Sequence, residues 1–233
     1  MLTDLQRQIR AIVTELPDGA AVALAGGSAL IATGVVRRGT EDLDFFTAHP
    51  EPVTAVLSAF ETALAAAGLR VTRMQASQTH ARLLVQSDTD TTRVDLATDY
   101  RLMAPLRTDE GLILAGPELA ANKTLALFGR AEPRDYIDFE ALAQRFSLTE
   151  LCDLAASKDG GFTPSRLADA LDYIEQQPRE DFDLDDAAYR DLVTFSIATA
   201  TRLRELEPGL ENGGISISQN TPTPGGGSRR SHA

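Results

Sequence analysis

The chain has 233 residues, of which 43% are hydrophobic and 24% charged, and it carries a net charge of −12 at neutral pH. This composition is typical of a globular protein of one or two domains, and the acidity argues against a general nucleic-acid binder without excluding a local basic patch beside an acidic site. Cys152 alone cannot form an intrachain disulfide, and the sequence has neither a membrane-length apolar run nor a signal-peptide pattern, so we expect a cytoplasmic protein with no membrane partner.

The first half of the sequence alternates between helix and strand patterns. Thr3 and Gln6 form a capping box for a first helix, which is expected to end at the turn Pro17-Asp18-Gly19. Further along, short apolar or alternating runs predict strands, and longer periodic runs predict helices. The predicted strands are 20–25, 43–46, 69–74, 82–86 and 93–97, with helices at 28–34 and 51–67. Together these segments indicate a mixed sheet of four or five strands with flanking helices.

From residue 117 onward the pattern is helical. Ser147 with Glu150 makes a second capping box, and Thr163 caps a helix that has Pro164 in its first turn. The predicted helices are 117–129, 134–145, 147–157, 164–177 and 185–206. The segment from residue 212 is rich in Gly, Ser, Thr and Pro, which predicts disorder. We therefore expect an α+β fold in three parts: a sheet-containing unit over 1–116, an all-helical unit over 117–211 and a disordered tail over 212–233.

A glycine turn is the first candidate binding element. Gly26, Gly27 and Ser28 follow a predicted strand and open a predicted helix. Free N–H groups and the helix dipole favour a phosphate at such a place, so Gly27 and Ser28 are candidate nucleotide-binding residues. The alternative is a tight strand-to-helix connection that Ser28 caps. A P-loop is excluded, because the spacing differs and no Gly-Lys-Ser/Thr sequence occurs.

Three aspartates on predicted strands are candidate metal ligands. Asp42 and Asp44 are two residues apart, so their side chains point to one face of a strand, and a divalent cation would relieve their repulsion. Magnesium suits carboxylate and phosphate oxygens. Asp95 lies between apolar residues of a later strand and would be the third ligand of a site for phosphoryl transfer. The alternative for Asp95 is a buried ion pair with Arg82 or Arg93.

Lysine is rare in this chain, which has Lys123 and Lys158 among its 22 basic residues. A lysine is a compact point charge suited to a triphosphate, and Arg130 lies seven residues after Lys123, on nearly the same helical face. Asp135 and Asp138 are one turn apart at the start of the next predicted helix. The alternative is a surface lysine with an ordinary charge pair within one helix.

Three blocks of the sequence together resemble the AbiEii/MenT toxin family of nucleotidyltransferases, within the DNA polymerase β-like superfamily. The blocks are 26–30, 38–45 and 123–138, and the resemblance runs from about residue 20 to residue 145. It implies a nucleotidyltransferase catalytic core over 1–116 that uses Mg²⁺. By position it implies the following roles for the residues of the site. Asp42 and Asp44 bind metal and are catalytic together with Lys123 and Asp138, while Thr40, Lys123, Arg130 and Asp135 bind the nucleotide.

The family resemblance also implies a biological role. Such a toxin transfers a nucleotide from an NTP to the 3′ end of tRNA and is controlled by a cognate antitoxin. Two other readings keep the fold. In one, the acceptor is an aminoglycoside-like small molecule or a protein hydroxyl, which would suit the acidic surface better than RNA does. In the other, the chain is a catalytically silent relative that binds a nucleotide or an antitoxin.

Overall fold

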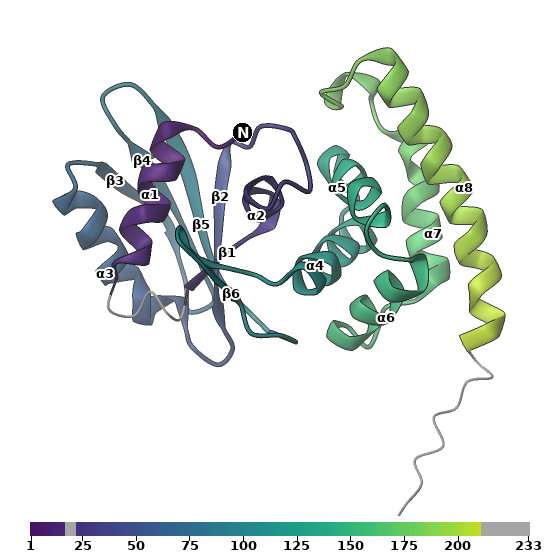
Figure 1. Ribbon diagram of the computed structural model, residues 1–233, viewed down its shortest axis with the longest axis horizontal. Coiled ribbons are helices and arrows are strands. Elements are labelled where there is room, and N and C mark those ends of the chain that lie inside the picture. Colours follow the sequence, from purple (N-terminus) through teal and green to yellow (C-terminus); the bar gives the residue numbers. More distant parts are fainter. Residues whose placement is uncertain (17–21, 211–233) are drawn as a thin grey trace, which may run out of the picture.

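The computed structural model describes residues 1–16 and 22–210, and in this part of the chain the central element is a mixed seven-stranded sheet (Figure 1). Its strands are β1 (Val22–Ala25), β2 (Asp42–Ala48), β3 (Arg70–Ala76), β4 (His80–Gln86), β5 (Thr91–Asp99), β6 (Leu106–Thr108) and β7 (Gly111–Ile113). Their order is β3-β4-β5-β2-β1-β7-β6. The neighbours β2 and β5, and also β1 and β7, run parallel, and the remaining pairs are antiparallel.

All five predicted strands are confirmed, and the expected count of four or five strands is wrong because of one small hairpin. The strands β6 and β7 have three residues each and join through a tight turn. Three residues are too few for an alternating pattern to show in the sequence. β7 nevertheless matters to the architecture, because it extends the sheet beyond β1 through the pairing of Leu24 with Ile113.

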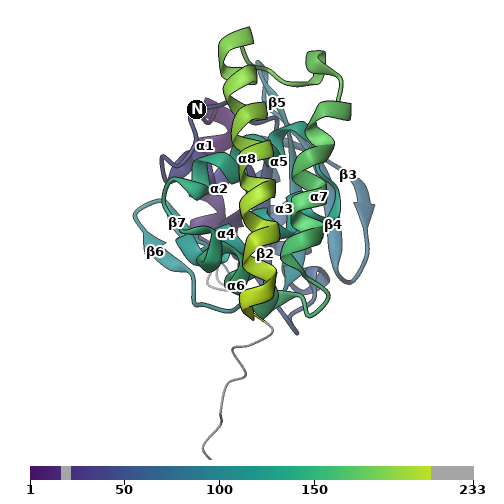
Figure 2. The same ribbon diagram turned by 90° about the vertical axis from the view of Figure 1, so that its right-hand side faces the viewer.

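Helices cover both faces of the sheet and then form a separate layer (Figure 1). α1 and α3 pack on one face, and α2 packs on β1 and β2 from the other side, facing α4. Seen from the helical side, α8 lies in front, beside α7 (Figure 2). Among the described helices, none is both long and apolar enough to cross a membrane. The helices are α1 (Asp4–Thr14), α2 (Gly26–Ala32), α3 (Val53–Ala66), α4 (Gly116–Gly129), α5 (Pro133–Ala143), α6 (Leu148–Lys158), α7 (Pro164–Asp172) and α8 (Asp186–Leu210).

The predicted helix starts are confirmed where side-chain caps define them. Thr3 and Gln6 form the capping box of α1, Ser147 accepts from the backbone N–H of Glu150 at the start of α6, and Thr163 caps α7. The helix predicted over 164–177 instead becomes a 3₁₀ segment, Tyr173–Gln176, after α7 ends. The predicted turn at 17–19 and the predicted tail at 212–233 lie outside the described residues.

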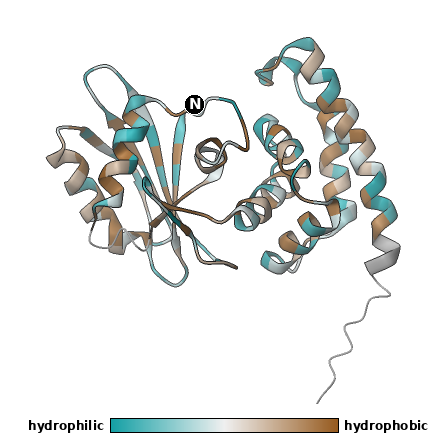
Figure 3. Cartoon of the chain, in the orientation of Figure 1, coloured by the Kyte–Doolittle hydropathy of each residue, from teal (hydrophilic) through white to brown (hydrophobic). Residues whose placement is uncertain are grey.

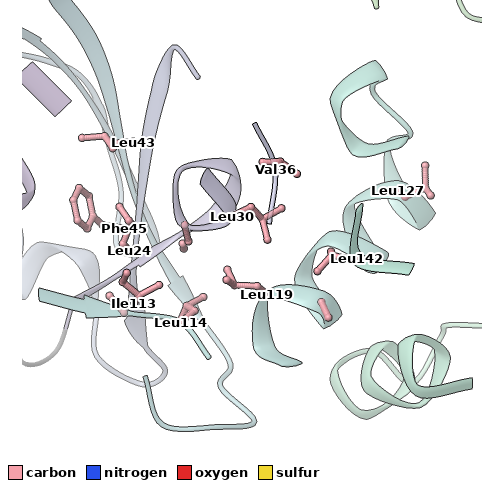
Figure 4. Close-up of a cluster of buried hydrophobic side chains, with 14 of the residues drawn as sticks. Leu24, Leu30, Val36, Leu43, Phe45, Ile113, Leu114, Leu119, Leu127 and Leu142 are labelled. Atoms are coloured by element: carbon pink, nitrogen blue, oxygen red, sulfur yellow. The ribbon is translucent and has the colours of Figure 1, made fainter. Parts of the chain in front are cut away.

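One apolar core runs from the sheet into the helical layer. Hydrophobic residues recur along the strands and along the helices of both halves (Figure 3). Between the halves, Leu30 of α2 and Val36 after it belong to the same hydrophobic cluster as Leu119 of α4 and Leu142 of α5, and all four side chains are buried (Figure 4). Because this cluster excludes water from the junction, the two halves are held together by hydrophobic burial. A site between them therefore has support from both sides.

A buried ion-pair cluster joins the same two halves. Lys158 at the end of α6 places its Nζ 2.6 Å from an oxygen of Asp99 and 2.6 Å from an oxygen of Glu118, and it donates to the side-chain carbonyl of Asn122. The second carboxylate oxygen of Glu118 accepts two backbone N–H groups of the segment that follows β5. The Lys158 side chain is only 4% exposed. The cluster thus fixes α4 and α6 against the end of β5.

We predict that Lys158→Met destabilises the protein strongly, because it leaves two partly or fully buried carboxylates without their cation. The expected loss is about 3–5 kcal/mol of unfolding free energy in urea denaturation. Arg202→Met is the matched control, since Arg202 is exposed, and it should change stability by less than about 0.5 kcal/mol. A Lys158→Met protein as stable as the control would contradict a structural role for this cluster.

Candidate active site

A pocket of about 300 Å³ lies between the sheet and the helical layer, at the start of α2. It is lined by glycine backbone, three aspartates and five lysine or arginine side chains. The lining residues are Gly26, Gly27, Arg38, Thr40, Asp42, Asp44, Phe46, His80, Arg82, Asp95, Ala97, Asn122, Lys123, Ala126, Arg130 and Arg134. Seven of the ten predicted site residues are among them. The other three, Ser28, Asp135 and Asp138, are fully buried and contact residues of the lining.

Strand pairing brings the three predicted carboxylates together. Asp42 and Asp44 alternate with buried residues along β2, and Asp44 is the register partner of Asp95 on the parallel strand β5. Burial raises the pKa of Asp44, the charges of Asp95 and Asp42 add to the rise, and the Lys123 ammonium opposes it. Within the described residues, no hydrogen bond or ion pair holds the Asp44 carboxylate. Asp44 is therefore the acid of the pocket that most lacks a positive partner.

The glycine pair allows backbone and side chains to approach closely. Gly26 has φ +57°, and a Cβ placed on it would lie 1.9 Å from a carboxylate oxygen of Asp44. A Cβ on Gly27 would lie 2.6 Å from a guanidinium nitrogen of Arg38. A side chain is therefore strained at Gly26 by the backbone conformation as well as by Asp44, whereas a side chain at Gly27 would have to displace the guanidinium of Arg38.

Ser28 does not line the pocket, and it does not cap α2, whose N-cap is Ala25. The Ser28 hydroxyl donates to the carbonyl of Ala25 at 2.9 Å and accepts from the backbone N–H of Asp44 at 3.3 Å. It thereby ties the start of α2 to β2 beside the carboxylates. The alternative expectation of a Ser28 cap is wrong, because the first helical turn begins two residues earlier, at Gly26.

Three arginines pair with the two carboxylates that neighbour Asp44, namely Asp95 and Asp42. Arg82 donates to both oxygens of Asp95, at 2.7 and 2.9 Å, as the ion-pair alternative predicted. Arg93 donates to Asp42 at 2.6 Å, and Arg134 lies 3.6 Å from the other oxygen of Asp42. The bidentate pairing of Arg82 with Asp95 fixes the orientation of both partners. Asp95 faces the predicted metal site, with both of its oxygens engaged.

The surface-lysine alternative for Lys123 is wrong, because this side chain is only 7% exposed. Its Nζ lies 2.8 Å from an oxygen of Asp138, and Arg38 donates to both oxygens of the same carboxylate, at 3.0 and 2.8 Å. Burial alone would raise the pKa of Asp138, but the charges and hydrogen bonds of Lys123 and Arg38 outweigh it and hold the pKa below its usual range. Asp138, which does not line the pocket itself, thus fixes the positions of Lys123 and Arg38, which do.

Asp135 repeats this arrangement one helical turn earlier. It is fully buried, accepts from Arg130 through both oxygens at 2.8 and 2.9 Å, and caps α5 by accepting from the backbone N–H of Glu132. Thr40 lines the pocket, and its hydroxyl donates to the carbonyl of Asp42 at 3.1 Å. The two aspartates of α5 therefore orient the basic side of the pocket, while Thr40 holds the start of β2.

Basic side chains gather at the pocket although the chain is acidic. The five lysine and arginine residues of the lining exceed its three aspartates by two charges when His80 is counted as neutral, and buried Asp135 and Asp138 behind the lining balance this excess. The local cluster of basic residues beside an acidic site, which the overall charge of −12 left open, is therefore present, with its cations paired. The sequence assigned no role to Arg38 or Arg134, and it named Arg82 only as an alternative partner of Asp95. Arg38 and Arg134 could have been found there, because both lie inside the blocks that carried the family resemblance.

The donor set suits a magnesium ion that is shared with a phosphate. Among the described residues, no group of three or more His, Cys, Asp or Glu side chains converges as a ready-made metal site. Asp42 and Asp44 nevertheless line one pocket, and Asp44 lacks a bound partner, so a divalent cation would relieve its burial and repulsion. Magnesium is commonly held by one or two carboxylates together with substrate phosphates and water, and these residues fit that pattern.

We predict that Asp138→Asn weakens the fold in a pH-dependent way. The folded-state pKa of Asp138 is below its usual value, so its ionised form stabilises the protein above about pH 4, and this contribution is lost as the pH falls through the folded pKa. The variant should lose about 3–5 kcal/mol at neutral pH, because Lys123 and Arg38 lose their shared partner. Urea denaturation from neutral to acidic pH should show a shallower acid dependence than in the wild type. Parallel curves for the two proteins would contradict this role.

The fold resembles that of known nucleotidyltransferase structures. A candidate nucleotidyltransferase from Helicobacter pylori is 21% identical with a TM-score of 0.58, over 88% of this chain and 96% of that one. JHP933, also from Helicobacter pylori, is 20% identical with a TM-score of 0.55, over 91% and 98%. MenT4, a nucleotidyltransferase toxin from Mycobacterium tuberculosis, is 18% identical with a TM-score of 0.54, over 89% and 90%. At these identities the likeness shows the fold.

No curated protein matches the sequence significantly. The family comparison is decisive, because the pattern of the nucleotidyl transferase AbiEii toxin, of type IV toxin–antitoxin systems, matches residues 10–199. That range includes the sheet, the pocket and most of the helical layer. The chain belongs to the AbiEii family of nucleotidyltransferase toxins.

Proposed function

We propose that this nucleotidyltransferase depends on magnesium and transfers a nucleoside monophosphate from an NTP to the 3′ end of tRNA. The observation that carries the proposal is that Asp42 and Asp44 lie on one face of β2 and line the same pocket as a basic wall. This basic wall consists of the side chains of Arg38, Lys123 and Arg130. A polyphosphate needs the basic wall, and a shared cation needs the acids. As a member of a toxin family of type IV systems, the chain has an antitoxin partner, and action on tRNA would place both in the cytoplasm.

In this proposal each side of the pocket has its own task. Asp42 and Asp44 would hold Mg²⁺, which supplies Lewis-acid stabilisation of phosphate charge when it is bound. Lys123 and Arg130 would neutralise the triphosphate, and the bare backbone of Gly27 would let a phosphate approach the start of α2. Because buried aspartates orient both cations, they need little rearrangement when the substrate enters.

The residues around these five have supporting tasks. Ser28 and Thr40 hold the backbone of β2 at the two acids, and Asp135 and Asp138 hold the cations. Asp95 would contribute as a third metal ligand if Arg82 released it on substrate binding. In the reaction, the acceptor hydroxyl attacks the α-phosphorus and gives up its proton, and a new P–O bond forms. The bond from the α-phosphorus to the β-phosphate oxygen breaks, and pyrophosphate leaves.

A second acceptor class is favoured by one observation, the net charge of −12. An acidic protein surface attracts a cationic acceptor, such as an aminoglycoside-like molecule, more strongly than it attracts RNA. A protein hydroxyl is the other acceptor of this kind. We place tRNA first because five lysine and arginine side chains gather at the pocket, where a 3′ end would have to enter.

We predict that Asp44→Ala and Lys123→Ala each abolish transfer, with a loss of at least about 10³-fold, because each removes charge stabilisation at the reacting phosphate. The measurement is incorporation of label from each α-labelled NTP into total tRNA in the presence of magnesium. Circular dichroism should show folded variants, and exposed Arg202→Ala should keep wild-type activity. Full activity in either site variant would contradict the roles assigned to Asp44 and Lys123. If no RNA becomes labelled, the acceptor is instead a small molecule or a protein.

We also predict that Asp44→Asn makes the metal-free protein more stable while it destroys transfer. The wild-type acid is buried beside two other acids, which raises its pKa, so its ionised form weakens the fold at neutral pH. An amide of the same shape removes this penalty, and the expected gain is on the order of 1 kcal/mol in EDTA. Thermal denaturation of the two proteins in EDTA makes the comparison. A destabilised Asp44→Asn would mean that the carboxylate has a partner of its own.

A further inference from the structure

A second hollow, of about 450 Å³, adjoins the candidate active site. The two share Arg38, Thr40, Asp42 and Arg134, so they meet at residues that include a predicted metal ligand. The far wall of the hollow is the segment before α8, which no part of the sequence analysis connected with the site. A substrate that places a phosphate at Asp42 would extend directly into this hollow.

The hollow has an apolar surface of its own, formed by two separate segments. Pro133 and Ile137 at the start of α5 and Leu184 on the opposite wall all line it, and each is half-buried. Apolar groups that converge from two separate elements favour a flat or compact uncharged part of a ligand. The start of α5 therefore has a polar side, turned to the pocket, and an apolar side, turned to the hollow.

The free polar groups of the hollow are hydrogen-bond acceptors. Asp181 and Asp183 line it, and within the described residues neither side chain forms a hydrogen bond or an ion pair. The charged groups nearest to them are engaged: Arg38 by Asp138, Glu41 by Arg93 and Arg134 by Glu132. An ionised carboxylate accepts hydrogen bonds and donates none, and it repels phosphate. The hollow therefore suits a neutral group with N–H donors, whereas the neighbouring pocket suits a polyphosphate.

The wall that presents these two acids is held in place. Arg179 donates to the backbone carbonyls of Phe182 and Leu184, and its guanidinium stacks on the ring of Tyr189 at 4.7 Å. Phe182, between the two aspartates, is buried against Tyr136 and Tyr189. Asp181 ends a short 3₁₀ helix, Arg179–Asp181, and buried Phe182 anchors the chain directly after it. The backbone that carries the two exposed acids is therefore held at the rim of the hollow.

We propose that this hollow binds the nucleoside of the NTP and that Asp181 and Asp183 select a base with an exocyclic amino group. The inference rests on the proposed function, because it assumes that the α-phosphate lies at Asp42. A base amino group would donate to the free carboxylates, whereas a carbonyl at the same place would face them with like partial charge. Cytosine would therefore be preferred to uracil, and adenine to hypoxanthine.

The test compares ligands that differ in one group. Calorimetric titration with magnesium and no acceptor should show CTP binding about tenfold more tightly than UTP, and ATP more tightly than ITP by a similar factor. In Asp181→Asn/Asp183→Asn both ratios should fall to about one, because an amide can donate as well as accept. The matched control is Asp88→Asn/Asp109→Asn, which removes the same charge from two exposed hairpin turns and should keep both ratios.

Inorganic tripolyphosphate separates this inference from the proposed function. It should bind the wild type and the Asp181→Asn/Asp183→Asn protein, here called the rim variant, equally well. It should bind Lys123→Ala far more weakly. If tripolyphosphate and NTPs bind neither protein, the proposed function fails. If tripolyphosphate binds as expected while the base ratios do not respond to the rim substitutions, the nucleoside lies elsewhere and the inference is overturned. The same holds if the rim variant changes only the KM for the acceptor.

Discussion

Asp138 is fully buried on α5, and its two oxygens bind Lys123 of α4 and Arg38 of the segment before β2. This contact joins three separate parts of the chain at the rear of the pocket. Because an isolated buried charge is costly, Asp138 needs at least one of these cations beside it, and each group helps to fix the position of the others. These ion pairs keep Lys123 and Arg38 in fixed positions in the same pocket as the carboxylates of β2. Without Asp138, two cations would repel each other and the pocket would lose its shape.

The carboxylates of the pocket affect stability in the opposite way to Asp138, because one of them destabilises the fold. Asp44 is buried beside Asp42 and Asp95 without a bound partner of its own among the described residues, which weakens the fold in the absence of a cation. Gly26 leaves no room between its backbone and that acid. A site that is unfavourable when empty and favourable when it is filled is typical of binding sites, where function and stability conflict. The local structure thus supports the proposed metal-dependent chemistry more directly than any single residue does.

Much of this could be predicted from the sequence, for identifiable reasons. Strand alternation placed Asp42 and Asp44 on one face, and the alternative for Asp95 anticipated its pairing with Arg82. Helix caps such as Thr3 were readable because they depend on neighbours a few residues away. The hairpin of β6 and β7 was too short to leave a pattern. The buried roles of Ser28 and Asp138 depend on contacts 16 and 100 residues away in the chain, and no local pattern encodes these.

The most direct test of this account is a crystal structure with a non-hydrolysable NTP and Mn²⁺ in place of magnesium, read by anomalous scattering. The account predicts a manganese peak between Asp42 and Asp44, with the triphosphate against Lys123 and Arg130 and the base toward Leu184. A manganese peak or a triphosphate outside this pocket would contradict it.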